Sequence, residues 1–364
     1  MKNKILLIGP KPSTKGGVTI WMKIVLDYLM NNDVDDISVK HLSISRSVSL
    51  THLLPIHKRL YYSIKDYSRG LMNLIKTLRK ENFDKMHILS SLGIGIVRDW
   101  LYVKVACYYN VKPIVHYHCG TLPITLESNS WLSRLLISTL SSSYKSIVLD
   151  EESYKALMNK GFNNVIKIGN SFNVEIESLE KSRIIRNENE ILFVGHNVRE
   201  KGIFELIDAC STIDNVTLNI YGPQNEIIQH EIDEKLKHIT FKGTINFMGL
   251  QPSNEIYKAM RRASLFVLPT YTEGFPYVIV EAMASGCPII TTPVGAIQEM
   301  LTLGDELVGY LVNPKDAIAL HKQISYCINH KNEIKEQARK AKLKAYKEYS
   351  TSAVMTKFIN LWKE

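Results

Sequence analysis

Residues 268–288 read LPTYTEGFPYVIVEAMASGCP, a stretch that combines an apolar run, a polar loop and a second apolar run bounded by glycine and proline. A strand is expected to end at Leu268, and a loop with a glutamate and a glycine follows it. Pro276 suits the first position of a helix, where its missing N–H would be unpaired in any case. Gly286 is a good left-handed cap for the end of that helix. The segment therefore predicts a strand, a loop and a helix, as in a βαβ unit.

The chemistry of this segment depends on Glu273 and Gly274, before the helix, and on Glu281 within it. A glycine lets a ligand approach the free N–H groups of a helix start, and the helix dipole adds positive charge, so the turn suits a phosphate. The two glutamates would be about 12 Å apart if the interval were helical. One carboxylate can then bind a sugar while the other reaches a ribose. The simpler alternative is that Glu273 caps the helix and Glu281 is exposed.

Short apolar segments alternate with helical patterns along the whole chain, which favours parallel sheets covered by helices. One series starts at Lys4–Gly9 and a second at 190–195, after a polar stretch at 173–190. We expect an α/β protein with two doubly wound, Rossmann-like domains that face each other across a cleft. In the second series, strands are expected at Thr217–Tyr221, Ile239–Lys242, Leu265–Leu268 and Pro288–Thr292.

Six more segments carry glycines, histidines or basic residues. They read GGV (16–18), VHYHCG (115–120), FVGHNVREKG (193–202), YGP (221–223), FKGTI (241–245) and PVGAIQE (293–299). A bare glycine pair is more often a plain turn, and a lone histidine is more often a core residue. In this order and spacing, however, the segments resemble those of the retaining glycosyltransferases of family 4, which have the two-domain GT-B fold. The resemblance covers nearly the whole chain.

The resemblance implies roles in the second half of the chain. Glu273 corresponds to the glutamate near the donor sugar and diphosphate, and Glu281 to the one that holds the ribose hydroxyls. The amides around Gly274, Phe275 and Pro276 would line the donor pocket, with Pro276 offering only its ring and carbonyl.

The family grips the diphosphate through an arginine and a lysine. Lys201 falls on the lysine position, where it would neutralise charge on the departing phosphate. His196 stands at the arginine position, which departs from the family pattern. Either His196 serves as a weaker donor or Arg199 takes over. Gly222 corresponds to the family's glycine turn.

The remaining segments complete the site that the resemblance implies. Thr244 and Ile245 belong to the segment whose backbone meets the nucleotide base. In the first half, Gly16 and Gly17 match the flexible loop that closes over the donor phosphates.

The family's active-site histidine contacts the transferred sugar. His118 is preferred for this role because it is nearer the loop, and strand alternation keeps His116 as a candidate on the same face. Cys119 is unusual at the next position.

The resemblance implies an N-terminal acceptor-binding domain (1–172), a C-terminal nucleotide-sugar-binding domain (173–345) and a final helix (346–364) that packs back on the first domain. It implies a retaining, metal-independent transferase that uses a nucleoside-diphosphate sugar, with UDP preferred over GDP or ADP, and no other cofactor. Asp33-Val34-Asp35 resembles a metal-binding D-x-D motif, but it lies between a helix and a strand, and we interpret it as a polar turn.

The net charge of +9 is partly local, because seven Lys/Arg and one acid lie between His52 and Lys80. This stretch predicts either a basic amphipathic helix on an anionic membrane or a solvated helix that packs on its own sheet. With Trp131–Ile137, it suggests a lipid-linked glycan acceptor in bacterial surface polysaccharide synthesis.

The five cysteines form no C-x-x-C pair, as expected in a reducing compartment. With no signal peptide and no membrane-spanning run in the sequence, we expect a cytoplasmic protein at the inner face of the membrane. Two other classes of protein fit parts of the sequence. A nucleotide-sugar epimerase of the same fold would consume the donor without an acceptor. A nucleic-acid-binding protein would explain the charge, but the chain lacks a known binding motif, so no nucleic-acid partner is expected.

Overall fold

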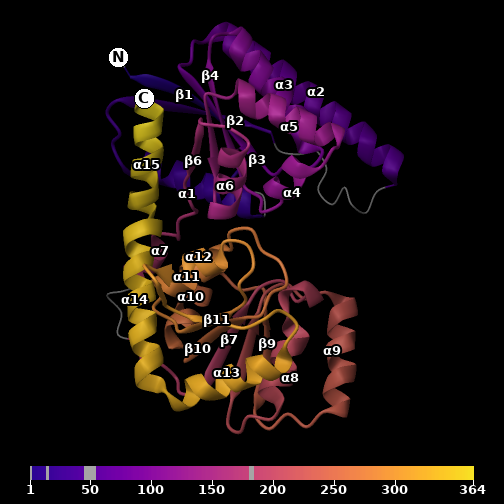
Figure 1. Ribbon diagram of the computed structural model, residues 1–364, viewed down its shortest axis with the longest axis vertical. Helices are drawn as coiled ribbons and strands as arrows, with labels where there is room; N and C mark the ends of the chain where they lie inside the picture. The colour runs from indigo at the N-terminus through magenta and orange to yellow at the C-terminus, as the bar shows by residue number, and fades with distance from the viewer. Residues whose placement is uncertain (1, 14–15, 45–54, 180–183) are drawn as a thin grey trace. The chain divides into compact units, whose positions relative to one another are not determined.

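The computed structural model describes residues 2–13, 16–44, 55–179 and 184–364. The chain forms two compact units. Unit 1 comprises Met1–Asn170 and Val354–Glu364, and unit 2 comprises Ser171–Ala353. Each unit is built around one six-stranded parallel sheet with helices packed on it (Figure 1), which confirms the predicted Rossmann-like fold. The cleft between the domains stays a prediction.

The sheet of unit 1 has the strand order β2-β1-β3-β4-β5-β6. Its strands are β1 (Asn3–Gly9), β2 (Ile37–Ser43), β3 (Lys85–Ser90), β4 (Lys112–Tyr117), β5 (Lys145–Val148) and β6 (Val165–Lys167). The order of the strands reverses between β1 and β3. The carboxyl ends of these two strands therefore form the switch point at which open α/β sheets bind ligands.

Two sets of helices cover this sheet. One core is formed with α2 (Ile56–Lys80), α3 (Gly95–Tyr108), α4 (Leu122–Glu127), α5 (Trp131–Ser142) and α6 (Glu151–Asn159). A different set of strand side chains meets α1 (Gly17–Asn31) and α15 (Thr351–Lys363). There the ring of Trp21 lies 5.2 Å from that of Phe358, centroid to centroid. The last residues of the chain are thus part of the core of unit 1.

The sheet of unit 2 has the order β14-β11-β10-β7-β8-β9. Its strands are β7 (Glu190–Val194), β8 (Thr217–Tyr221), β9 (Thr244–Gly249), β10 (Leu265–Leu268), β11 (Ile289–Thr291) and β14 (Tyr310–Leu311). All four residues of β10 are buried, as is typical of a parallel strand covered on both faces. The switch point of this sheet lies between β7 and β10.

The helices of unit 2 follow the strands in turn. They are α7 (Glu175–Leu179), the 3₁₀ turn η2 (Arg199–Lys201), α8 (Ile203–Ser211), α9 (Glu226–His238), α10 (Ser253–Arg262), α11 (Tyr277–Ala284), α12 (Ile297–Met300), α13 (Ala317–Asn329) and α14 (Lys331–Tyr349). A short antiparallel pair, β12 (Thr302–Leu303) and β13 (Glu306–Leu307), follows α12. None of the helices in the described ranges is long and apolar enough to cross a membrane.

The strand predicted at Ile239–Lys242 is wrong, because the chain first enters the sheet at Thr244. Helix α9 continues to His238, and the Lys242 N–H donates to the Ser211 carbonyl at the end of α8 instead of to a strand. Gly243 then passes so close to β8 that a Cβ would lie 2.0 Å from the Val216 oxygen. The alternation of two apolar residues therefore resembles a strand pattern, although the segment is the connection between α9 and β9.

Candidate donor site and histidine cluster

The switch point of unit 2 brings Lys201 and Glu273 together. Lys201 ends η2, after β7, and Glu273 lies in the loop after β10. The Lys201 Nζ forms an ion pair with the Glu273 Oε1. Both side chains remain partly exposed, at 24% and 14%. A positive and a negative group thus meet at the place where this topology binds ligands.

Backbone and hydroxyl contacts fix these two loops to each other. The Tyr271 N–H donates to the Glu200 carbonyl at 2.8 Å, and the Thr270 hydroxyl donates to the same oxygen at 3.1 Å. The Tyr271 hydroxyl donates to the Glu205 Oε1 at 2.6 Å, and burial raises the pKa of this tyrosine. The ion pair is therefore held by a network of short contacts around it.

The structure distinguishes His196 from Arg199 as the residue that could take the place of the family's diphosphate-binding arginine. The Arg199 guanidinium forms an ion pair with Glu231 on α9 and lies 4.3 Å from the ring centroid of Phe204. His196 is exposed in the loop directly after β7. To reach a diphosphate, Arg199 would have to give up its contacts with Glu231 and Phe204, whereas His196 would have neither contact to give up.

Glu281 lies on α11 and accepts a hydrogen bond from the Tyr257 hydroxyl of α10 at 3.1 Å. Burial raises the pKa of the Glu281 carboxyl to about 7, and the hydrogen bond from Tyr257 acts in the opposite direction. The Tyr277 hydroxyl, one turn earlier, is buried without a partner among the described residues. Burial and the neighbouring Glu281 raise the pKa of Tyr277 well above its usual range. Nothing in the sequence pattern indicated either tyrosine.

Pro276 occupies the N-cap of α11 instead of the first helical position, and no side chain caps the helix. Gly274 precedes this cap, and its carbonyl accepts from the Ala296 N–H at 2.9 Å. Phe275 is buried, and its ring faces Tyr349 of α14 at 5.7 Å. The side chain of Phe275 therefore packs into unit 2, and only its backbone is available to the loop. Gly286 caps the far end of α11 with φ 65°, as predicted.

Gly222 has a packing reason for being glycine. Its φ is 140°, and a Cβ would lie 1.8 Å from the Gly195 oxygen. The close approach of β8's end to the loop after β7 therefore requires glycine there. Gly295 is similar, because a Cβ there would lie 2.2 Å from the backbone carbonyl oxygen of Glu273. These contacts keep the loops around Lys201 and Glu273 compact.

Thr244 and Ile245 are not brought together with the other candidates. They begin β9, where they pair with Thr217 and Leu218, so they lie at the amino end of the sheet. The opposite end of β9 is Gly249, whose carbonyl accepts from the Gly222 N–H at 2.9 Å. Placing the strand after Gly243 would have indicated the segment around Gly249 as the one near the site.

In unit 1, Gly16 and Gly17 form the start of α1. Gly16 is the N-cap with φ 131°, and its carbonyl accepts from the N–H groups of Thr19 and Ile20. Both glycines are exposed. Residues 14–15 of the same loop lie outside the described residues. Asp33 and Asp35 lie in the connection between α1 and β2.

His116 and His118 lie at the end of β4 with their rings 4.0 Å apart, centroid to centroid, and tilted by 38°. His116 is fully buried, whereas His118 is partly exposed just beyond the strand. The backbone N–H of His118 donates to the Ser90 carbonyl at 2.7 Å. Strand alternation therefore predicted their common face correctly. His118 is the histidine nearer the carboxyl end of the sheet.

The sequence missed the aromatic residues around these histidines. The Trp21 ring lies 5.1 Å from His116, 5.7 Å from His118 and 5.4 Å from His87 on β3. The Trp362 Nε1–H of α15 donates to the His87 Nδ1 at 3.1 Å. We call His87, His116, His118, Trp21, Phe358 and Trp362 the histidine cluster. Its members come from four distant segments, so no local pattern could reveal it.

The histidine cluster keeps its imidazoles neutral. Burial lowers the pKa of His87 and of His118 to about 3 each, and for His87 the neighbouring His118 adds to the effect. Burial also lowers the pKa of His116 well below its usual range. A neutral imidazole at His118 can donate or accept one hydrogen bond without bringing a charge.

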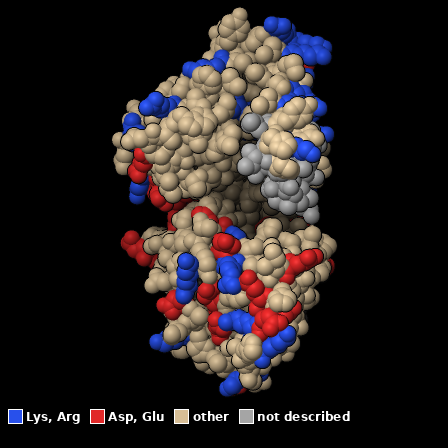
Figure 2. Space-filling model, turned by 90° about the vertical axis from the view of Figure 1, so that its right-hand side faces the viewer, with Lys and Arg blue, Asp and Glu red and all other residues tan. Residues whose placement is uncertain are grey.

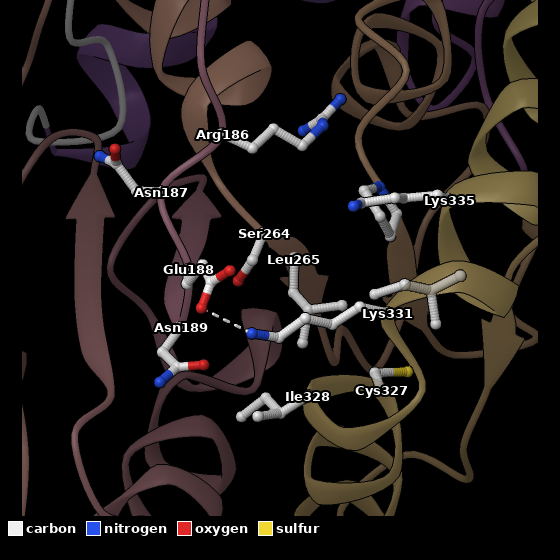
Figure 3. A pocket seen from close by; sticks show the side chains of 12 residues that line it. Arg186, Asn187, Glu188, Asn189, Ser264, Leu265, Cys327, Ile328, Lys331 and Lys335 are labelled. Atoms are coloured by element: carbon white, nitrogen blue, oxygen red, sulfur yellow. Dashed lines mark hydrogen bonds and ion pairs between the residues drawn. The ribbon is translucent and has the colours of Figure 1, made fainter.

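A separate cavity of about 90 Å³ lies in unit 2, at the opposite end of the sheet from Lys201 and Glu273. Its lining includes Leu265, the first residue of β10, and the Glu188–Lys331 ion pair at 2.8 Å (Figure 3). Arg186 at its edge donates to the carbonyls of Met260 and Ala263 and so has a structural role. None of the predicted donor-site residues lines this cavity.

Two Rossmann-like units, each with a six-stranded parallel sheet, are the architecture of the GT-B fold, and a sucrose-phosphate synthase of Thermosynechococcus elongatus matches it over 100% of this chain with a TM-score of 0.73 at 18% identity. Residues 174–347 match the family model described as glycosyl transferases group 1. An uncharacterized glycosyltransferase of Methanocaldococcus jannaschii, MJ1178, is 31% identical over 83% of this chain and 80% of its own length. The chain belongs to the glycosyl transferases group 1 family.

Two further relatives and one further solved structure also match much of the chain. An uncharacterized 41.2 kDa protein in the cps region of Klebsiella pneumoniae is 26% identical over 96% of this chain and 97% of its own. The capsular polysaccharide biosynthesis glycosyltransferase CapM of Staphylococcus aureus is 25% identical over 71% of this chain and 65% of its own. The crystal structure of Anabaena HepE in complex with UDP matches with a TM-score of 0.72 at 16% identity, over 99% of both chains. That last likeness shows the fold.

Proposed function

We propose that the protein transfers a sugar from a nucleoside-diphosphate sugar, with UDP as the preferred nucleotide, to a hydroxyl of a lipid-linked glycan in bacterial surface polysaccharide synthesis. The observation that carries the proposal is the meeting of Lys201 and Glu273 at the switch point of unit 2, with Glu281 on the helix that follows. The UDP bound to HepE supports the nucleotide, and the role of CapM in capsular polysaccharide biosynthesis supports the pathway class.

In the proposed reaction the anomeric configuration is retained without a metal. The bond from the sugar C1 to the diphosphate breaks as the acceptor oxygen attacks the same face, and a leaving phosphate oxygen takes the acceptor proton. Lys201 and the uncapped start of α11 stabilise the leaving diphosphate. Glu273 orients the sugar and Glu281 holds the ribose. Unit 1 binds the acceptor, and His118 contacts the transferred sugar as a neutral imidazole.

The first test is a thermal-shift series with UDP, GDP, ADP and their sugar conjugates in the presence of a chelator. A ligand that binds the native state raises Tm by mass action. We expect a shift with UDP that is lost in the Glu281→Ala variant. The absence of a shift with all of these nucleotides would refute the proposed donor class.

The second test is kinetic. Glu273→Ala and Lys201→Ala should each lower kcat by about 10²- to 10³-fold, because each removes a group that acts on developing charge. Arg199→Ala serves as the control, because its side chain is occupied by Glu231. Near-normal transfer by Glu273→Ala would refute the site assignment. An inverted anomer in the NMR spectrum of the product would refute the proposed retention.

A further inference from the structure

The outward face of α2 carries exposed apolar side chains among its cations. Tyr61, Ile64 and Met72 are exposed by 61%, 60% and 63%. They recur at helical spacing with exposed Lys58, Lys65 and Arg69, so all six lie along one side of the helix. We call these six residues the α2 stripe. Of the basic stretch noted in the sequence, residues 52–54 lie outside the described residues.

The length of α2 explains why these apolar side chains have no core beneath them. The helix has 25 residues, about 37 Å at 1.5 Å per residue. The strands of the same sheet have at most seven residues, about 23 Å. Leu74 and Leu78, which enter the core, belong to the last two turns of the helix. Tyr61 and Ile64 thus lie in the half of α2 that, among the described residues, contributes none to this core, and Met72 lies on the side of the second half that faces away from it.

The charge of the α2 stripe is strongly positive. The single acid of α2, Asp66, has a side chain only 11% exposed and lies 3.7 Å from the Arg69 guanidinium. The Lys65 Nζ lies 6.0 Å from the ring centroid of Tyr61, so cations and apolar groups are interleaved. On the face of unit 1 seen in Figure 2, Lys and Arg side chains outnumber Asp and Glu.

The topology places more exposed apolar groups at the same end of unit 1. Helix α3 follows β3 and begins at the carboxyl end of the sheet, as α2 does after β2; α5 follows α4 and leads into the parallel strand β5, so it begins toward the same end. Ile94, just before α3, is 68% exposed, and Trp131, which begins α5, is 58% exposed. His118 lies at this end as well. The apolar groups thus lie at the end of unit 1 to which the acceptor is assigned.

We propose that the α2 stripe binds unit 1 to an anionic lipid bilayer, with the carboxyl end of its sheet next to the membrane surface. An amphipathic helix of this kind lies in the interface, with its apolar groups among the acyl chains and its cations at the headgroups. A nucleic acid would attract the cations but would leave Ile64 and Met72 without an apolar environment. This inference rests on the proposed function, since a lipid-linked acceptor would then be delivered beside His118.

Vesicle flotation of the full chain tests this surface. Wild-type protein should float with vesicles of phosphatidylcholine and phosphatidylglycerol but not with phosphatidylcholine alone, and less in high salt. Lys58→Glu/Lys65→Glu should weaken partitioning by about thirtyfold or more, from roughly fivefold per lysine. The double variant Tyr61→Ser/Ile64→Ser should also weaken partitioning into the vesicles, because it removes two apolar side chains of the α2 stripe without changing its charge. The control Lys104→Glu/Lys160→Glu makes the same charge change on exposed lysines of α3 and the end of α6, and should retain binding within threefold.

Thermal shift with UDP on the same samples separates the two proposals. A UDP shift without flotation overturns the membrane surface and leaves the proposed donor in place. Flotation without a shift supports the membrane surface and contradicts the proposed function. Equal loss of binding in the control pair, or retention on DNA but not on vesicles, overturns the membrane surface.

Discussion

Glu281 is a carboxylate whose surroundings disfavour its charge. Its pKa is about 7 in the folded protein, against an ordinary value of 4.5, because it is buried. Between these values the folded state binds more protons than the unfolded state, so stability falls as the pH rises from about 4.5 to 7. A carboxylate with such a raised pKa supports a ligand-binding role for Glu281, since perturbed groups concentrate at functional sites.

Replacing Glu281 with glutamine should therefore stabilise the ligand-free protein at high pH. We expect the Tm of Glu281→Gln to exceed that of the wild type above pH 7, with the difference vanishing toward pH 5. Thermal unfolding between pH 5 and pH 8 measures this. The exposed Glu226→Gln on α9 is the matched control and should follow the wild-type curve. A lower Tm for Glu281→Gln at pH 8 would mean that the carboxylate is stabilising.

At the scale of elements, the loops after β7 and β8 are packed as closely as two backbones allow. Gly222→Ala should destabilise the protein by about 3 kcal/mol or more, because its Cβ would collide with the Gly195 carbonyl. Gly249→Ala is the control: its φ is 63°, but a Cβ there meets nothing within 4 Å, so we expect about 1–2 kcal/mol. Urea unfolding compares them, and equal losses would contradict the collision.

The histidine cluster predicts acid sensitivity of unit 1. For His87 and His118, the folded pKa of about 3 lies below the ordinary 6.5, so the folded state binds fewer protons between these values. Their contribution is complete above about pH 6.5 and is lost as the pH falls toward 3. Unit 1 should therefore unfold before unit 2 on acidification.

Tryptophan fluorescence between pH 7 and pH 4 follows this loss, because Trp21 and Trp362 belong to the cluster. His116→Phe should make the pH dependence shallower. Neither ring nitrogen of His116 has a partner among the described residues, so the substitution removes a titrating group without breaking a hydrogen bond. An unchanged slope would show that His116 is not part of the acid response.

Local patterns predicted elements better than they predicted contacts. The strands at Thr217–Tyr221 and Leu265–Leu268 have the bounds expected from their apolar runs. Ile239–Lys242 was wrong, since two alternating apolar residues are too short a pattern to distinguish a strand from a connection. Lys201 and Glu273 were selected by a family resemblance. Their ion pair joins residues 72 apart in sequence, and periodicity carries no information about such contacts.

At the scale of the whole molecule, the chain passes from unit 1 to unit 2 at Asn170 and returns at Val354. A final helix was expected at 346–364, whereas α14 continues to Tyr349 and α15 begins at Thr351, with the extended Ser350 between them. The return places Phe358 and Trp362 in the core of unit 1, where Trp362 also accepts from the buried Lys85 Nζ through its carbonyl at 2.9 Å. Unit 1 is therefore completed by residues from the far end of the chain.

Truncation after Ala353 should destabilise unit 1 selectively. Truncation removes the buried side chains of Phe358 and Trp362. Loss of one such aromatic side chain from a core lowers the free energy of unfolding by about 3–5 kcal/mol. Differential scanning calorimetry should show a lower-temperature transition for unit 1, while the transition of unit 2 still responds to UDP. A uniform decrease of both transitions would contradict this division.

The return of α15 also has a consequence for protein synthesis. The ribosome makes residues 1–170 before any of unit 2, and it makes the residues that cover His87 and Trp21 only after unit 2. At 5–20 residues per second, translation of unit 2 takes about 10–40 s. During that interval the nascent first unit has an uncovered aromatic face, which makes it a natural client for chaperones, and the face is covered only once residues 354–364 are available.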